Sequence, residues 1–531
     1  MSDRTGRIAG RAAGMADNAL EDRGEEVPGR RRWLILAVVA LAQLMVVLDA
    51  TIVNIALPSA QRALHFSNTD RQWVITAYAL AFGSLLLLGG RLADLLGRKA
   101  MFLAGLAGFA VASAVGGAAT NFAMLVTARA CQGAFGALLA PAALSLLTTT
   151  FTGSRDRGKA FGVFGAIAGA GGGIGLLVGG LLTQYASWRA CLEVNLVFAA
   201  IAGTGAVLLL RQQQDRQQHG LDLPGVLAEG GATFCIVYGF SNAATHSWQS
   251  PDTWGFLAAG SVGLAAFAWW QTRAAHPLLP LRIVLDRDRV AAYLSILIAG
   301  AGLFGIFLLL TYYLQQTLGY SPVTTGLAFL PMVACIVAFA NLSNIVLLPR
   351  IGPKLLVAPG MLLAAGGLAW LTRIGVHSSY LSDVLPSLLV AGAGIGFVVS
   401  TSINTATAAA EPSDAGVASA LANTGQQVGG SIGTSLLNSV AASATAAYLT
   451  ASSLHATAGG RPTQALTELA QVHGYTTAFW WAAGIFAGGA VTAGLLFRSG
   501  PPPRPTAPAT ARKHTSLRHH GYPAAAATSH Q

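Results

Sequence analysis

Charged residues are scarce in this chain. They make up 10% of the 531 residues, while 53% of the residues are hydrophobic, whereas soluble globular proteins have about 25% charged residues. The four cysteines, at positions 131, 191, 235 and 335, lie inside apolar runs without a CxxC spacing, which argues against a metal site or a disulfide framework. The composition predicts a polytopic membrane protein.

Motifs of nucleic-acid-binding proteins, nucleotide-binding proteins and enzymes are also missing. The formal charge is +11, but no window combines a basic patch with interleaved aromatics, so we expect no nucleic-acid partner. The stretch GSRDRGKA from Gly153 fits GxxxxGK, yet Ala160 stands where a P-loop has Ser or Thr, and no strand precedes it. No credible catalytic triad stands out either, so we expect that the protein is not an enzyme and that it binds no nucleotide, metal or cofactor. We expect an ion gradient to be its energy source.

Long apolar runs make up most of the sequence. A window of about 19 residues places fourteen spans. They lie near 33–57, 72–90, 100–119, 122–147, 160–182, 190–210, 221–241, 254–270, 290–314, 323–347, 355–373, 384–402, 415–440 and 478–497. An even number predicts both termini on one side.

Basic residues mark that side. They cluster in every second loop, for example at Arg91 to Lys99, at Arg155 to Lys159, and at Arg350 with Lys354. An excess of Lys and Arg is typical of cytoplasmic loops. We therefore expect both termini in the cytoplasm, with the polar segments 1–29 and 498–531 disordered.

An internal repeat links two glycine-rich segments. Gly171, Gly172 and Gly175 recur as Gly429, Gly430 and Gly433, at a constant offset of 258 residues. The repeat predicts duplicated halves, with the seventh and eighth spans inserted between them, and a transport site at the interface of the halves.

Four motifs carry a resemblance to a known family. The break after the second span, GGRLADLLGRKAMFLAG, places Gly90, Asp94, Gly97, Arg98 and Lys99 in a polar turn. LDATIVNIALP lies in the first span, and ARACQG lies in the fourth. GGGIGLLVGG in the fifth span has the glycine ladder of an antiporter motif, with Leu176 at the usual proline. Its ladder glycines are Gly171, Gly175, Gly179 and Gly180.

In combination, the chain resembles the fourteen-span drug:proton antiporters of the major facilitator superfamily. The resemblance implies an all-α polytopic fold of two six-helix bundles with two extra transmembrane helices between them. Its divisions would be a disordered cytoplasmic N-terminus at 1–29, a bundle at 30–211, the inserted helices at 212–289, a second bundle at 290–497 and a disordered tail at 498–531. The polar turn would be a cytoplasmic latch between the halves.

Two buried charges are expected at similar depth. Asp49 lies about 13 Å and Arg129 about 10 Å from the outer ends of their helices, at 1.5 Å per residue. If both faced one cavity, Arg129 would hold Asp49 ionised until hydration or substrate changed the balance, which is what proton coupling requires. The alternative is a permanent ion pair that only fixes helix packing.

Two further carboxylates allow more than one interpretation. Glu193 follows Arg189 by four residues, which is compatible with a surface ion pair or with a second proton-coupling or substrate-binding group. Glu229 lies about 12 Å from the cytoplasmic end of an inserted helix. We expect its side chain to reach toward water.

The expected substrate class follows from the resemblance and from polar groups in the spans. Candidate cavity-lining residues are Asn54, Gln132, Tyr312, Gln316, Asn404 and Gln426. The resemblance implies a monomeric, proton-coupled exporter of amphipathic drugs or antibiotics in the bacterial cell membrane, working by alternating access. A gradient-coupled transporter of a defined metabolite (amino acid, osmolyte or siderophore) and a non-transporting membrane sensor are the alternatives.

Overall fold

The computed structural model describes residues 29–151, 154–210, 222–246, 248–274, 278–279, 285–408, 415–455 and 463–500. All regular structure in these ranges is helical. The predicted disordered ends, 1–29 and 498–531, lie almost entirely outside them.

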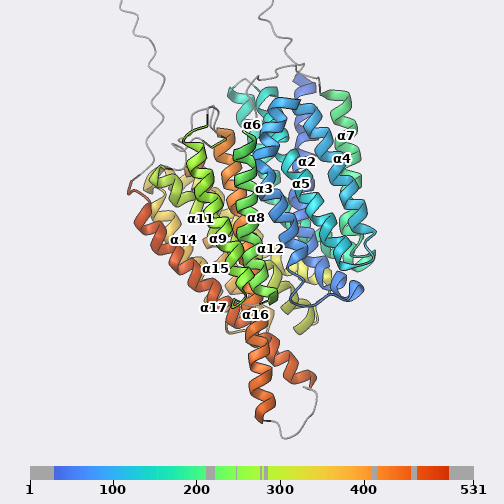
Figure 1. Ribbon diagram of the computed structural model, residues 1–531, viewed down its shortest axis with the longest axis vertical. Helices are drawn as coiled ribbons and strands as arrows, with labels where there is room; N and C mark the ends of the chain where they lie inside the picture. The colour runs from blue at the N-terminus through green and yellow to red at the C-terminus, as the bar shows by residue number, and fades with distance from the viewer. Residues whose placement is uncertain are drawn as a thin grey trace, which may run out of the picture.

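Within the described ranges, fourteen long helices, one over each expected span, form two bundles and an inserted pair (Figure 1). The first bundle contains α2 (Gly29–Leu64), α3 (Trp73–Leu96), α4 (Arg98–Gly117), α5 (Phe122–Thr150), α6 (Ser154–Tyr185) and α7 (Ala190–Leu209). The inserted pair is α8 (Leu223–His246) and α9 (Pro251–Gln271).

The second bundle contains six long helices with π-helical extensions. They are α11 (Arg287–Tyr312) with η1 (Tyr313–Thr317), α12 (Pro322–Leu342) with η2 (Ser343–Leu347) and α13 (Leu348–Ile351), α14 (Lys354–Leu371), α15 (Leu385–Ala408) after η3 (Tyr380–Val384), α16 (Ala415–His455) and α17 (Gln464–Leu496).

Ten segments are long and apolar enough to cross a membrane, when the described residues are searched. They cover most or all of α2, α3, α4, α5, α7, α11, α12, α14, α15 and α17. The chain is therefore a multi-pass membrane protein, as predicted, while the count of fourteen spans stays a prediction.

The two bundles repeat one packing pattern. In the first bundle α2 packs on α6, α3 and α4 pack on α5, and α4 packs on α7. In the second bundle α11 packs on α16, α12 and α14 pack on α15, and α14 packs on α17. The repeated glycines explain part of this symmetry: Gly171 and Gly175 lie against α2, and Gly429 and Gly433 lie against α11. Small residues let helix backbones approach closely.

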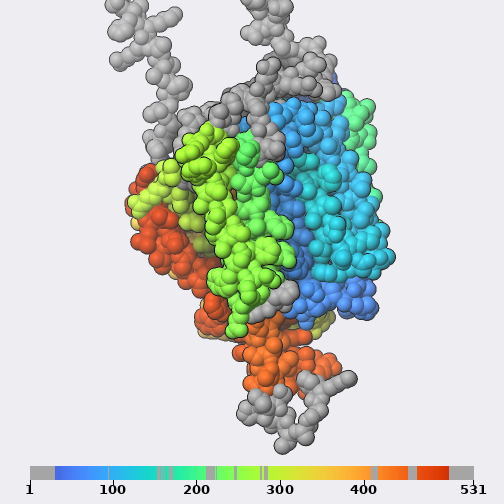
Figure 2. Space-filling view, viewed as in Figure 1, coloured from blue at the N-terminus to red at the C-terminus, as the bar shows by residue number. Residues whose placement is uncertain are grey.

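The bundles meet along two reciprocal helix pairs, α3 with α16 and α6 with α12. Helix α8 packs on both α3 and α16, and α9 packs on α8. The inserted pair therefore covers the α3–α16 side of the junction, where its surface (green) lies between the blue first bundle and the red end of the chain (Figure 2).

The two ends of the molecule differ. Both termini of the described chain lie at one end, which we call the terminal end (Figure 1). At the other end α16 and the start of α17 project as a hairpin, so we call it the hairpin end. Helix α16 has 41 residues and is about 62 Å long at 1.5 Å per residue, about twice the thickness of a bilayer's hydrocarbon core.

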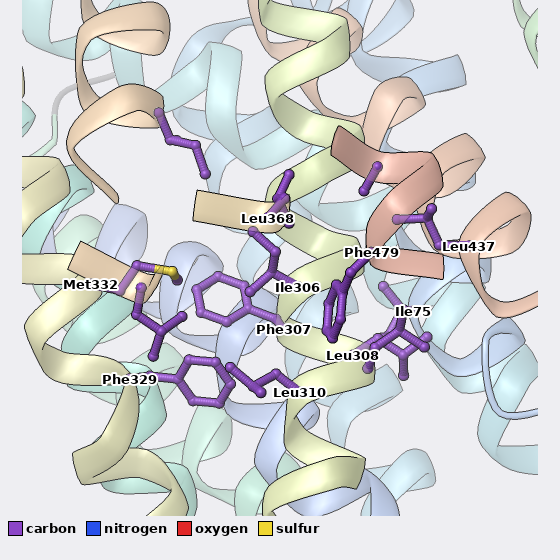
Figure 3. Close-up of a cluster of buried hydrophobic side chains, with 14 of the residues drawn as sticks. Ile75, Ile306, Phe307, Leu308, Leu310, Phe329, Met332, Leu368, Leu437 and Phe479 are labelled. Carbon is purple, nitrogen blue, oxygen red and sulfur yellow. The ribbon is translucent and has the colours of Figure 1, made fainter. Parts of the chain in front are cut away.

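Apolar packing joins the bundles near the hairpin end. One cluster of buried side chains includes Ile52 and Ile75 of the first bundle together with Ile306, Phe307 and Phe329 of the second. Figure 3 shows part of it, with α11 at its centre and Leu437 of α16 on one side. A second cluster, running from Ile35 to Leu210, has all its buried members in the first bundle.

Candidate functional site

Asp49 and Arg129 form a buried ion pair inside the first bundle. The Arg129 guanidinium lies 2.6 Å from the Asp49 carboxylate, and the side chains are 2% and 0% exposed. Asp49 lies near the middle of α2 and Arg129 lies on α5. The similar depth inferred from the sequence is compatible with this direct contact.

Three side chains donate hydrogen bonds to the Asp49 carboxylate. They are Arg129 at 2.6 Å, Asn195 at 2.7 Å and Gln132 at 3.1 Å. Ser113 of α4 accepts from Gln132 at 2.7 Å and from Asn195 at 3.3 Å, which extends the network to a fourth helix. An ion pair in a low-dielectric interior needs such additional hydrogen bonds to offset its desolvation.

Arg129 is held on its other side by α3. Its Nε donates to the carbonyl oxygen of Val74 at 3.1 Å, and its guanidinium carbon lies 4.5 Å from the centroid of the Tyr78 ring. It also donates to Gln132 at 2.9 Å. The planar fork of arginine suits this set of acceptors, because its donors point in fixed directions.

Sequence reasoning missed Asn195 and Ser113. The only signal was a small polar residue within an apolar run, which is common in helices of this composition. The sequence had pointed to the nearby Glu193 instead.

The Glu193 side chain is exposed, beside Gly117 of α4, and makes no described contact with Asp49. Arg189 donates to the Ala119 carbonyl at 2.7 Å and lies over Trp188, and within the described residues no ion pair joins it to Glu193. A coupling role for Glu193 stays a prediction.

The expected latch turn is shorter than predicted, because only Gly97 separates α3 from α4. Gly90 and Asp94 lie within α3, and Arg98 and Lys99 begin α4. Lys99 donates to the carbonyls of Val207 and Leu210 at the end of α7, so its described contacts remain within the first bundle. Arg98 is half-buried and Gly90 faces Pro141 of α5. The side chain of Asp94 lies outside the described part of the structure. A latch role for this turn stays a prediction.

The glycine motif of α6 has two packing sides. Gly171, Gly175 and Gly179 lie against α2, on the segment that carries Asp49. Gly180 lies against Pro322 and Val323 of α12, in the other bundle. Helix α6 thus connects the segment around Asp49 to the junction between bundles.

The candidate cavity residues are distributed more widely than expected. Gln132 belongs to the Asp49 network, Asn54 is buried on α2 and bonds to its own helix, and Tyr312 is fully buried. Gln316 and Asn404 are exposed, and Gln426 is half-buried. A common role in lining a cavity stays a prediction.

Glu229 differs from expectation. Its side chain is only 7% exposed, on a helix that packs on both α3 and α16, instead of reaching water. As for metals, no group of three or more His, Cys, Asp or Glu side chains suited to an ion occurs among the described residues.

Comparisons with known proteins agree with a transporter fold. The chain has the same fold as a bacterial homolog of the human lysosomal transporter Spinster, at a TM-score of 0.61 and 15% identity, covering 88% of this chain and 98% of that one. A peptide transporter of the POT family gives a TM-score of 0.61 at 16% identity, covering 88% and 97%.

Residues 39–434 match the Major Facilitator Superfamily. The chain belongs to this superfamily and is a membrane transporter. It is 48% identical over 474 residues to the puromycin resistance protein pur8 of Streptomyces alboniger, covering 89% of this chain and 92% of that protein. It is 37% identical over 433 residues to the cephamycin export protein CmcT of Amycolatopsis lactamdurans, covering 80% and 89%.

The tetracenomycin C resistance and export protein of Streptomyces glaucescens is 36% identical over 415 residues, covering 78% of this chain and 76% of that protein.

Proposed function

We propose that the protein exports amphipathic antibiotics across the bacterial cell membrane in exchange for protons, with both termini in the cytoplasm. Relatives named for antibiotic resistance and export support the substrate class. The basic loops support the orientation. The buried Asp49 carboxylate is the observation that carries the coupling, because an ionisable group in a membrane interior is expected to be functional.

The contacts suggest how a proton acts. In this structure Asp49 accepts three hydrogen bonds and pairs with Arg129. Protonation removes the charge that holds Arg129 of α5 to α2. Because α6 packs against α2 near Asp49 and against α12 across the junction, a shift of α2 reaches the contact between the bundles.

The access state follows from where the bundles touch. Most of their described polar contacts lie toward the hairpin end, where Gln315 donates to the Ile55 carbonyl at 3.0 Å and Val323 donates to Gln184 at 3.2 Å. The bond from Thr424 to the Gly83 carbonyl lies nearer the terminal end. We assign this arrangement to the state closed to the outside, in which substrate enters from the cytoplasm. Alternation with an outward-open state would complete export.

Purified protein in liposomes with an imposed pH gradient tests the proposal. Puromycin, other antibiotics and cationic dyes are added one at a time, and proton release is measured. The comparison is Asp49→Asn against Asp252→Asn, which makes the same change at an exposed residue. We expect release in the wild type and in Asp252→Asn, and its loss in Asp49→Asn.

Other results would redirect the interpretation. Release unchanged in Asp49→Asn would leave Asp49 as a structural partner of Arg129. An absence of release with every compound would favour a carrier of one metabolite or a non-transporting sensor.

A further inference from the structure

Glu229 is a buried carboxyl group on an inserted helix, outside the Asp49 network. Its side chain is 7% exposed and lies six residues into α8, about 9 Å from the helix start at 1.5 Å per residue. Its one described hydrogen bond comes from Thr233, one turn further along the same helix, at 3.4 Å. No ion pair joins it to a basic side chain within the described ranges.

The helices around Glu229 provide polar groups and little charge. The Ser84 hydroxyl of α3 is buried without a hydrogen-bond partner, and the neighbouring Gly230 of α8 faces the Ser84 carbonyl. On α16, Thr424 donates to the Gly83 carbonyl at 3.4 Å, and the buried Gln427 side-chain oxygen has no partner.

The helices that pack on or beside α8 have few charged residues, and none of these is in a described contact with Glu229. Helix α16 has none from 415 to 454, and α9 has only Asp252, at its far end. Helix α3 has Arg91 and Asp94, seven and ten residues beyond Ser84 toward the terminal end. Neither is in a described contact with Glu229.

An ionised carboxylate in this position would be buried without a counterion among the described residues, which is strongly unfavourable. A neutral carboxylic acid removes that cost and can also donate to an acceptor. The environment therefore favours the protonated form as long as the α3–α8–α16 junction stays packed. A rearrangement that admitted water would favour release of the proton.

We propose that Glu229 is a second proton-binding site of the transporter, loaded in this closed junction and emptied when α16 moves against α3. The site lies where the inserted pair touches both bundles, so its protonation would depend on their relative position. This gives the insertion a role in coupling, and it rests on the proposed proton exchange.

Infrared spectroscopy of the purified protein, in a detergent without ester groups, tests the protonation directly. A buried carboxylic acid gives a C=O band that moves to lower frequency on transfer from H₂O to D₂O. We expect such a band in the wild type, its loss in Glu229→Gln, and its retention in Asp49→Asn. Glu468→Gln, the same change near the hairpin tip, is the matched control.

Glu229→Gln imitates the neutral acid, so we expect it to fold. If it did not, Thr233→Val decides, because loss of the hydrogen bond should move the band to higher frequency. An unchanged band in Glu229→Gln, or in Thr233→Val where the former cannot be purified, would overturn the proposal.

A second measurement connects the site to transport. We expect Glu229→Gln to release about half as many protons per bound puromycin as the wild type, because one of two sites is lost. An unchanged proton count would overturn the role in coupling. If puromycin released no protons from the wild type, the proposed exchange would fail, while the infrared result would still decide whether Glu229 is protonated.

Discussion

Arg71 of the α2–α3 loop donates a hydrogen bond to Asn438 of α16 at 2.9 Å, across the junction between the two bundles. The Arg71 guanidinium also lies over the ring of Tyr312 of α11, 3.9 Å from its centroid. Asn438 in turn donates to the Asn68 carbonyl at 3.2 Å and to Gln72 at 3.3 Å. One loop of the first bundle is thus bonded to two helices of the second, at the hairpin end.

Replacing Asn438 by leucine should loosen this closure. Hydrogen bonds to charged groups contribute about 1.5–3 kcal/mol, and each 1.4 kcal/mol is tenfold in an equilibrium, so the open state should gain roughly tenfold or more. The measurement is the rate at which a membrane-impermeant maleimide labels Thr76→Cys from outside, in a background lacking the native cysteines. Thr76 is buried beside Ser435 in the closed junction.

Asn423→Leu is the matched control, because Asn423 lies on the same helix with an exposed side chain that bonds only within α16. Equal labelling rates in the two leucine variants would contradict a closing role for Asn438.

The α6–α12 contact should respond to added bulk. A Cβ atom on Gly326 would lie 2.5 Å from the Leu176 carbonyl oxygen, so Gly326→Val forces α12 away from α6. We expect faster labelling of Thr76→Cys from outside, as for Asn438→Leu. Gly484→Val, on an open face of α17, should leave the rate unchanged. If both valine variants labelled alike, this contact would not hold the junction closed.

The helix positions could be predicted from the sequence because each apolar run is long and ends in polar residues. The hairpin could not be predicted. Helix α16 continues past residue 440 through turns rich in Ala, Ser and Thr, and α17 begins before residue 478 with turns that include Gln, Glu and His. A span prediction follows hydrophobicity, and these turns are helical outside the expected membrane core.

The candidate site could be predicted from the sequence only in part. Asp49 and Arg129 stood out as charges in apolar runs, and their similar depth in the membrane indicated that the two side chains could lie close together. The contact between Arg71 and Asn438 could not be predicted, because nothing in a single sequence shows that the two side chains lie side by side. Glu229 was misjudged for a similar reason: its distance from the helix end suggested water, but packing of α8 on two other helices buries it.

Arg129→Lys should be strongly destabilising although the charge is kept. A single ammonium group cannot reach the Val74 carbonyl, Asp49 and Gln132 in the directions of the guanidinium fork. A lost charge-assisted hydrogen bond costs about 1.5–3 kcal/mol, which should lower the thermal unfolding midpoint. Arg62→Lys, at an exposed site, is the control. Equal midpoints would mean that the fork geometry is unimportant.

Gly97→Ala should strain the turn between α3 and α4 without any clash. Gly97 has φ 100° and ψ 132°, a conformation that residues with a Cβ rarely adopt, and no atom lies within 4 Å of an added Cβ. The cost is then backbone strain alone, about 1–3 kcal/mol. Gly203→Ala, where an added Cβ also meets nothing but the backbone is helical, should be neutral or stabilising by up to about 1 kcal/mol. Thermal unfolding of the two purified variants separates these effects, and an equal change in midpoint would show that the turn does not depend on the glycine backbone.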